Sequence, residues 1–287
     1  MENFKLCLFS STPEVVDLGF IVKVLAGNPQ ELVERTLDWG YDGLEFLPDP
    51  HNIPDPIPFK HMVDDAGIGL YVVNSGRMAV QDLALIHEND EIRRRSVDAF
   101  KRMIDFAAHF KARAALGIAR GKGIPNATKE ENDAVADGVF RELTQHAEST
   151  GVVIMLEAAE PDITSYLNTN AQIMEWVDRI NSPCLSVHLD SHQLNGAENS
   201  IEEGIRVTRG MATHIHLYDP SRWPPGVIDA EDQLNWPEII RILRATHMPE
   251  TGSVVLAPEG DPGPVAIKSR DFLRSLLQAR DGSNEIR

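Results

Sequence analysis

Short apolar runs alternate along the chain with longer segments of helical spacing. The apolar runs are rich in β-branched residues and are bounded by turn-forming residues, as in strands that are buried on both faces of a parallel sheet. Between them, apolar residues recur three and four positions apart, which predicts amphipathic helices. The predicted strands are 5–10, 44–47, 69–74, 112–117, 152–157, 185–190, 213–219 and 253–259. The predicted helices are 29–39, 58–66, 91–110, 129–150, 169–180, 201–209, 236–246 and 265–279.

These strands and helices form consecutive strand–helix units, and no linker rich in glycine, serine or proline divides them. Eight such units in 287 residues predict an α/β fold, a (β/α)8 TIM barrel, rather than an open doubly wound sheet. We expect a single domain over residues 1–287, with 280–287 as a frayed polar tail. No glycine-rich phosphate loop follows the first predicted strand, which counts against nucleotide binding.

Four consecutive predicted strands end in a side chain that binds metals well: Glu157, Asp190, His216 and Glu259. Active sites of barrels lie at the carboxyl ends of the strands, so these four side chains are expected to meet. Three carboxylates and one imidazole suit one divalent ion with coordination positions open to substrate oxygens, Mn²⁺ as first choice and Mg²⁺, Co²⁺ or Zn²⁺ as alternatives. The alternative is a ring of ion-paired carboxylates, but few basic residues lie near these strand ends.

Three further histidines lie close to these ends. His214 is two residues before His216, so it shares the same face of its strand one layer deeper and is predicted to be packed or hydrogen-bonded. His188 stands in the same relation to Asp190 and is predicted to be a core histidine with satisfied hydrogen bonds. His192 lies just beyond the strand, where contact with a substrate and a supporting role are equally open.

Charge and composition restrict the partners. The formal net charge is −17, which repels nucleic acids and anionic membranes, so neither is expected as a partner. The N-terminal segment is too short and too acidic for a signal peptide, and no apolar run reaches membrane-spanning length. Cys7 and Cys184 lie in apolar runs, as reduced core thiols of a cytoplasmic protein do. The oligomeric state stays open, a homo-oligomer included.

The strand ends carry a resemblance to a known family. Leu156-Glu157, Leu189-Asp190-Ser-His192, His214-Ile-His216 and Pro258-Glu259 resemble the metal motifs of the xylose isomerase-like TIM barrel superfamily. They are most similar to its sugar (phosphate) isomerase and epimerase branch, which includes the ketose 3-epimerases. The turn Gly40-Tyr-Asp-Gly-Leu-Glu45 is also typical of it. The superfamily also contains endonuclease IV-type repair enzymes, but the extra histidines of their three-zinc cluster are missing here.

The resemblance implies roles for individual residues. Glu157 and Glu259 correspond to glutamates that are both metal ligands and catalytic acid/bases, and Arg222 to an arginine that binds the substrate. Two positions depart from the ketose 3-epimerase pattern. Ile163 replaces a substrate-binding glutamate, with Glu160 as the nearest acid, and Gln193 replaces a histidine, with His192 one place early.

The chemistry of these residues leads to three alternative functions. The first is a metal-dependent sugar isomerase or epimerase, which removes a proton next to a carbonyl through a metal-stabilised enediolate. The second is a metal-dependent lyase or dehydratase for an oxidised sugar or cyclitol, and the third is a non-enzymatic binder of sugar or metal. Trp223 is a candidate surface for sugar C–H groups. Asp261 would repel a phosphate after the last strand, which favours a non-phosphorylated polyol.

Overall fold

Hydrogen bonds between parallel strands close into a ring in the computed structural model, which describes residues 4–14, 25–229, 231, 233–256 and 260–279. The ring closes because β1 pairs with β3 on one side and with β9 on the other, so that neither β1 nor β9 is an edge strand. A short extra strand, β2, pairs with the end of β1. The strands are β1 (Lys5–Ser11), β2 (Leu25–Ala26), β3 (Gly43–Leu47), β4 (Gly69–Asn74), β5 (Arg113–Leu116), β6 (Ile154–Glu157), β7 (Leu185–Asp190), β8 (Ala212–Leu217) and β9 (Thr251–Val254).

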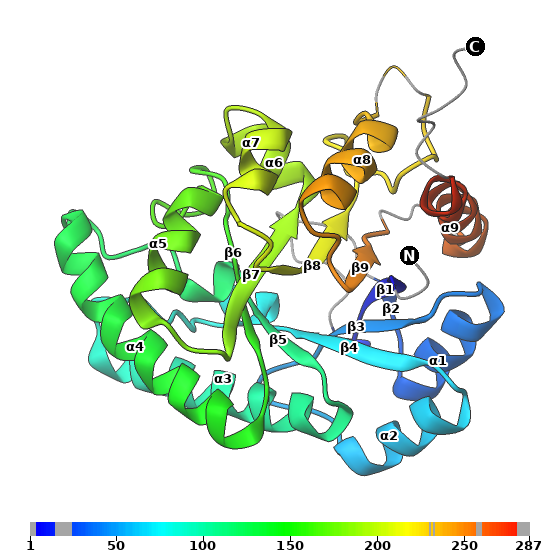
Figure 1. Ribbon diagram of the computed structural model, residues 1–287. Coiled ribbons are helices and arrows are strands. Elements are labelled where there is room, and N and C mark those ends of the chain that lie inside the picture. Colours follow the sequence, from blue (N-terminus) through cyan, green and yellow to red (C-terminus); the bar gives the residue numbers. More distant parts are fainter. Residues whose placement is uncertain (1–3, 15–24, 230, 232, 257–259, 280–287) are drawn as a thin grey trace.

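Helices surround this ring, and Figure 1 shows the strands in the middle with the helices outside them. The eight strands other than β2 and the helices that follow them confirm the predicted (β/α)8 barrel. The α-helices are α1 (Pro29–Asp38), α2 (Pro56–Asp65), α3 (Asp90–Phe110), α4 (Lys129–Thr150), α5 (Asn170–Ile180), α6 (Ser191–Ala197), α7 (Ile201–Arg206), α8 (Trp236–Thr246) and α9 (Pro262–Gln278). Two 3₁₀ turns, η1 (Gly76–Val80) and η2 (Ile118–Arg120), follow β4 and β5.

The elements depart from the sequence prediction at a few ends. Helix α6 was not predicted, and it begins where the Asp190 carboxylate caps its first backbone N–H groups. Helix α9 begins three residues early because Asp261 caps it and Pro262 occupies its first turn. Strand β9 is shorter than predicted and ends at Val254. Residues 257–259 at the end of that predicted strand, and the predicted tail 280–287, lie outside the described residues.

Two apolar clusters occupy the two faces of the sheet. The large cluster packs the outer face of the strands against the helices and includes Val73, Ala114 and Ile154. A small separate cluster contains Val72, Ala115 and Met155, each the direct neighbour of one of those residues. Because successive side chains of a strand point to opposite faces, the small cluster lies inside the barrel. Side chains two positions further along those strands therefore also point inward, at the carboxyl end.

None of the helices in the described part of the chain combines the length and apolar character needed to cross a membrane.

Substitution of Gly43 tests how closely strands β3 and β4 approach each other. A Cβ at Gly43 would lie 2.2 Å from the backbone oxygen of Gly69, which cannot move without disturbing the pairing of β3 with β4. We expect Gly43→Ala to lower the free energy of unfolding by about 1–3 kcal/mol. Gly138→Ala, in open space on α4, is the control and should raise it by about 0.5–1 kcal/mol. Equal effects of the two substitutions in denaturant unfolding would contradict this close packing.

Candidate metal centre

Three of the four predicted ligands meet at the carboxyl end of the barrel. Glu157 ends β6, Asp190 ends β7 and His216 lies near the end of β8, and each offers one ligand atom within 4.8 Å of the others. Nδ1 of His216 lies 3.2 Å from Oδ2 of Asp190 and 3.3 Å from Oε1 of Glu157. Glu259, the fourth predicted ligand and the second predicted catalytic residue, lies outside the described residues.

Asp190 is held in place by bonds to both carboxylate oxygens. Its Oδ1 accepts hydrogen bonds from the backbone N–H groups of His192 and Gln193, at 2.8 and 3.0 Å, in the first turn of α6. Its Oδ2 accepts a hydrogen bond of 2.9 Å from the hydroxyl of Tyr218, which is buried. Oδ2 therefore faces His216 in a fixed orientation, and the chain itself supplies the supporting bonds.

The carboxylate of Glu157 occupies space beside Gly117 that the side chain of any larger residue would fill. A Cβ at Gly117 would lie 2.1 Å from Oε2 of Glu157, so any side chain there would displace the carboxylate. The backbone of Glu157 is fixed by Arg120, which is buried and donates to the carbonyl oxygens of Glu157, Gly117, Tyr166 and Leu167. Burial lowers the pKa of Arg120 to about 10, so the guanidinium stays charged at neutral pH.

Glu45 is the site residue whose role sequence reasoning missed. Its side chain is fully buried, and its oxygens lie 3.0 and 3.1 Å from Nε2 of His216 and 3.0 Å from Nε2 of His214. Asn74 donates to Oε1 at 2.7 Å. The sequence did contain one signal for this role: Glu45 is an acid within the otherwise apolar strand β3. An acid at an inward position of a buried strand requires a partner inside the barrel.

Electrostatics support an ionised Glu45. Burial by itself raises the pKa of Glu45, but the charge of His216 and hydrogen bonds from both histidines outweigh it and hold the pKa well below its ordinary value. An ionised carboxylate only accepts hydrogen bonds, so Nε2 of His216 must be the donor. That leaves Nδ1 of His216 as the atom that faces Glu157 and Asp190. A histidine that binds a metal through one nitrogen commonly donates its other N–H to a carboxylate in this way.

Burial and mutual interactions shift the pKa values of His216, Glu157 and Asp190. Burial lowers the pKa of His216, but Glu45, Asp190 and Glu157 outweigh it and raise that pKa well above the ordinary value. Burial raises the pKa of Glu157, with Asp190 and Glu45 adding to it against the opposing effect of His216. Burial also raises the pKa of Asp190, but hydrogen bonding and the charge of His216 reverse this and leave the pKa below its ordinary value.

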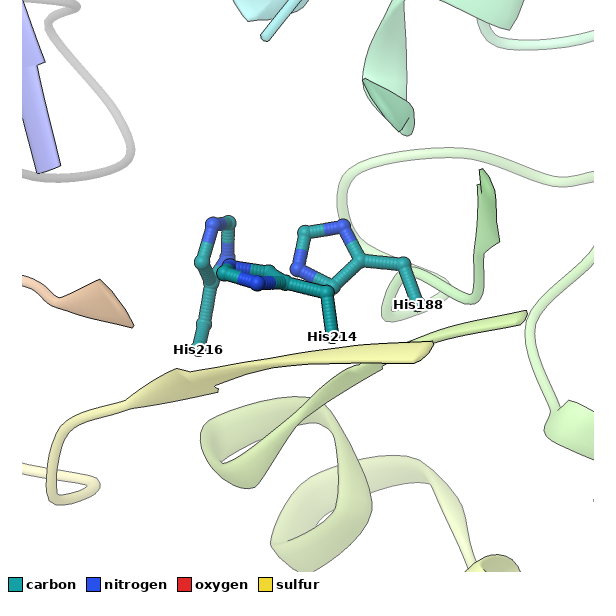
Figure 2. A group of neighbouring side chains, drawn as sticks. All are labelled: His188, His214 and His216. Atoms are coloured by element: carbon teal, nitrogen blue, oxygen red, sulfur yellow. The ribbon is translucent and has the colours of Figure 1, made fainter. Parts of the chain in front are cut away.

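A second group of possible ligands consists of three histidines inside the barrel. Figure 2 shows the rings of His214 and His216 rising from one strand, with the ring of His188 beside them. His214 is a poor ligand because Nε2 bonds to Glu45 and Nδ1 lies 2.6 Å from the Thr251 hydroxyl. That pairing confirms the prediction for His214. The donors around Nδ1 of His216 therefore fit a divalent ion better, being mostly oxygen with one imidazole.

His188 departs from its prediction. It is fully buried, as expected of a core histidine, and its ring centroid lies 4.2 Å from that of His216. Both of its ring nitrogens, however, lack a hydrogen-bond partner among the described residues. Burial and the neighbouring histidines lower its pKa well below the ordinary value, so the ring is neutral.

Two cavities open at this end of the barrel. The inner cavity has a volume of about 50 Å³ and is lined by residues that include Phe9, Asn74, Glu157, Asp190, Gln193, His216 and Val255. The outer cavity has a volume of about 790 Å³ and is lined largely by the segments that follow β4, β5 and β6. Ile118 and Ile163 line both cavities, so the two adjoin.

Two of the four predicted substrate-binding residues, Glu160 and Arg222, line the outer cavity, and none lines the inner one. Gln193, which departs from the ketose 3-epimerase pattern, does line the inner cavity. His192 lines neither; it stacks on Tyr218, and its Nε2 lies 3.3 Å from Oε1 of Glu160. Trp223 also lines neither, and its backbone oxygen accepts from the N–H of Asp219 in a tight turn that includes Arg222.

Comparison with known proteins extends this description. A family model described as xylose isomerase-like TIM barrel matches residues 33–276. A D-psicose 3-epimerase of Enterocloster bolteae is 30% identical over 133 residues, which cover 46% of this chain and 42% of the relative. An L-ribulose 3-epimerase of a Methylomonas species is 24% identical over 189 residues, which cover 64% of each chain. The chain thus spans about two fifths to two thirds of the length of these relatives.

Similarity of fold covers more of the chain. The crystal structure of a 3-keto-D-glucoside 4-epimerase from E. coli superposes with a TM-score of 0.77 and 17% sequence identity. The match covers 95% of this chain and 99% of that protein. At this level of identity the match shows a common fold.

The pairing of Glu45 with His216 leads to a test of metal affinity. In Glu45→Gln the amide lacks the charge that fixes the N–H on Nε2, so Nδ1 of His216 is no longer held ready for a metal. We expect the affinity for Mn²⁺ or Zn²⁺, measured by competition with a chelating dye, to fall ~10–100-fold. Glu34→Gln, the same change on the exposed face of α1, should leave the affinity unchanged. A folded Glu45→Gln protein with normal affinity would refute this role.

Proposed function

Because the chain belongs to the xylose isomerase-like TIM barrel family, we propose that it is a divalent-metal-dependent sugar isomerase or epimerase. The observation that carries the proposal is the convergence of Glu157, Asp190 and His216 on one point inside a cavity at the carboxyl end of the barrel. The similarity to proteins named ketose 3-epimerases supports it. The names of these relatives support a small polyhydroxylated carbonyl compound as substrate.

Asp190, His216, Glu157 and Glu259 would hold the ion. Asp190 and His216 have the roles of rigid ligands, because supporting hydrogen bonds fix both side chains. Mn²⁺ is the first candidate for a site of carboxylates and one imidazole, with Mg²⁺, Co²⁺ and Zn²⁺ as alternatives. A bound ion of this kind would polarise the carbonyl oxygen of the sugar and so make the neighbouring C–H more acidic.

Glu157 has the role of the proton carrier within the described residues. Its carboxylate lines the inner cavity, and burial raises its pKa, which makes it a better base and acid near neutral pH than an ordinary glutamate. Glu259 is proposed as its partner on the other face of the substrate. Return of the proton to the same carbon from the opposite face gives an epimer, and return to the neighbouring carbon gives an isomer.

Apolar walls of the inner cavity would limit the access of bulk water to this proton transfer. Phe9 and Val255 are buried apolar residues that line it, and the ring of Phe9 lies 5.3 Å from that of His216. A dry site strengthens the electrostatic interactions of the carboxylates. The cavity carries neither lysine nor arginine among its described lining residues, which suits an uncharged sugar carbon skeleton better than a phosphate at the reacting end.

A dehydratase would use the same ligands and the same base, and differs only in the fate of the carbanion. Loss of a neighbouring hydroxyl gives an enone with new ultraviolet absorbance, whereas epimerisation does not. The first experiment is therefore an activity screen of the metal-loaded protein over ketoses, aldoses, their phosphates and keto-inositols. It is read by NMR for exchange of a C–H with deuterated water, and by absorbance for loss of water.

Two glutamine substitutions test the proposed pair. An amide retains an oxygen for the ion but accepts no proton, so Glu157→Gln and Glu259→Gln should each lower turnover ~10²–10⁴-fold. With two bases on opposite faces, each variant should still exchange the C–H of one epimer only, and the two variants should differ in which one. Turnover, exchange and metal content are measured together, with Glu34→Gln as control. Near-normal turnover in both variants would contradict the proposed mechanism.

A further inference from the structure

We propose that the side-chain amide of Gln193 donates a hydrogen bond to the carbonyl oxygen of the substrate and stabilises the charge that this oxygen gains during the reaction. The inference rests on the proposed function and adds to it a residue that touches the reacting atoms. Gln193 lines the inner cavity together with Glu157, Asp190 and His216. Its side chain is 8% exposed, so the protein encloses it on most sides.

One hydrogen bond decides which end of the Gln193 amide faces the cavity. The backbone N–H of Glu160 donates to Oε1 of Gln193 at 2.6 Å. A backbone N–H can only donate, so the atom that it meets must be the amide oxygen and not the amide nitrogen. The opposite orientation of the amide would place two donors against each other. Nε2 is therefore the end of the side chain that remains available.

The Nε2 atom of Gln193 is open to the inner cavity. It donates no hydrogen bond to any of the described residues, whereas Oε1 of the same amide is bonded. It is also absent from the fully enclosed side-chain atoms of the described residues that lack a partner. Nε2 must therefore reach open space, and the inner cavity is the space that Gln193 lines. Both of its N–H groups are available to a substrate.

The other side-chain donor atoms in the described lining of this cavity already donate to carboxylates. Nδ2 of Asn74 donates to Glu45 at 2.7 Å, and Nε2 of His216 donates to the same carboxylate at 3.0 Å. The hydroxyl of Tyr218 donates to Asp190 at 2.9 Å. The carboxylate oxygens and Nδ1 of His216 are acceptors or metal ligands. A carbonyl oxygen in this cavity therefore finds its side-chain donor in the glutamine amide.

The proposed reaction makes that donor more effective as it proceeds. When the C–H proton moves to Glu157, the electron pair of the broken bond forms the carbon–carbon double bond of the enediolate. The electron pair of the carbonyl double bond then moves to the oxygen, which becomes negatively charged. A hydrogen bond to a charged oxygen is stronger than one to a neutral oxygen, so the amide stabilises the transition state more than the bound substrate.

Gln193 is held at both ends, so its donor is in place before the substrate enters. Its backbone N–H donates to Oδ1 of Asp190 at 3.0 Å, in the first turn of α6. The far end of its side chain is fixed by the N–H of Glu160. A donor that needs no rearrangement stabilises a developing charge best. Because the amide and the Asp190 carboxylate belong to the same turn, their relative positions are also fixed.

Binding of acetohydroxamate to the Mn²⁺-loaded protein tests the donor without any need for turnover. This small anion carries two adjacent oxygens in one plane, as an enediolate does. We expect Gln193→Leu to weaken its affinity, measured by isothermal titration calorimetry, ~10–100-fold, with unchanged manganese content. Gln145→Leu, the same change on the exposed face of α4, is the control and should have no effect. Equal affinity in a folded Gln193→Leu protein overturns the inference.

A second variant separates hydrogen-bond donation from mere support of the Glu160 segment. In Gln193→Glu a carboxylate oxygen can still accept from the N–H of Glu160, but no N–H remains for the probe. We expect the Glu160 amide to stay protected from hydrogen exchange and the affinity for acetohydroxamate to fall. Gln193→Leu carries no charge, so a loss that both variants share does not arise from repulsion. Wild-type affinity in Gln193→Glu would mean that Gln193 only supports the segment.

The measurements separate this inference from the proposed function. A protein that binds Mn²⁺ and exchanges a sugar C–H, but binds acetohydroxamate equally well in Gln193→Leu, keeps the proposed function and loses the donor. A protein that binds acetohydroxamate through Gln193 but exchanges no C–H on any sugar keeps the donor and loses the proposed reaction. Failure of the Mn²⁺-loaded wild-type protein to bind acetohydroxamate overturns the inference.

Discussion

A carboxylate at the centre of the barrel, that of Glu45, is buried with hydrogen bonds from two imidazoles and from the Asn74 amide. Removal of a carboxylate from water is costly unless charge and hydrogen bonds compensate for it. His216 provides charge and a hydrogen bond, and His214 provides a hydrogen bond, each through Nε2. The bond to His216 then directs the opposite nitrogen of that ring toward Glu157 and Asp190. The same interaction therefore allows a charge inside the barrel and orients the candidate metal centre.

The surrounding groups maintain this arrangement through backbone as well as side chains. Asp190 caps helix α6, so the same hydrogen bonds start the helix and orient a candidate ligand. Arg120 connects the end of β6 to the segment that contains Tyr166 and Leu167 through hydrogen bonds to their backbone carbonyl oxygens. Gly117 leaves the volume that the carboxylate of Glu157 occupies. A site assembled from separate strands depends on such supports, because small displacements change which atoms meet.

The two cavities at the carboxyl end of the barrel differ in size and in lining. The inner cavity is small and carries the carboxylates and the imidazole, as a proton-transfer site requires. The outer cavity is larger, and its lining mixes aliphatic side chains with charged ones. Its lining comes from segments after the strands, where sequence can vary without disturbing the barrel. Under the proposed function, the barrel would carry the reacting groups and the loops would contact the rest of the substrate.

The order of elements followed from sequence because strand and helix periodicities are local. Alternating runs predicted the barrel, and the ends of 69–74, 129–150 and 236–246 agree with the structure. Convergence of Glu157, Asp190 and His216 was also predictable, since the carboxyl ends of parallel strands meet in a closed barrel. The role of Glu45 was not, because its partners lie 169 and 171 residues away, and hydrogen bonds over such separations leave no periodic trace. For the same reason only the tertiary structure decided that Gln193 rather than His192 lines the inner cavity, and that Ile163 joins two cavities. Those facts depend on how side chains from different loops share space, which the order of residues along one strand does not specify.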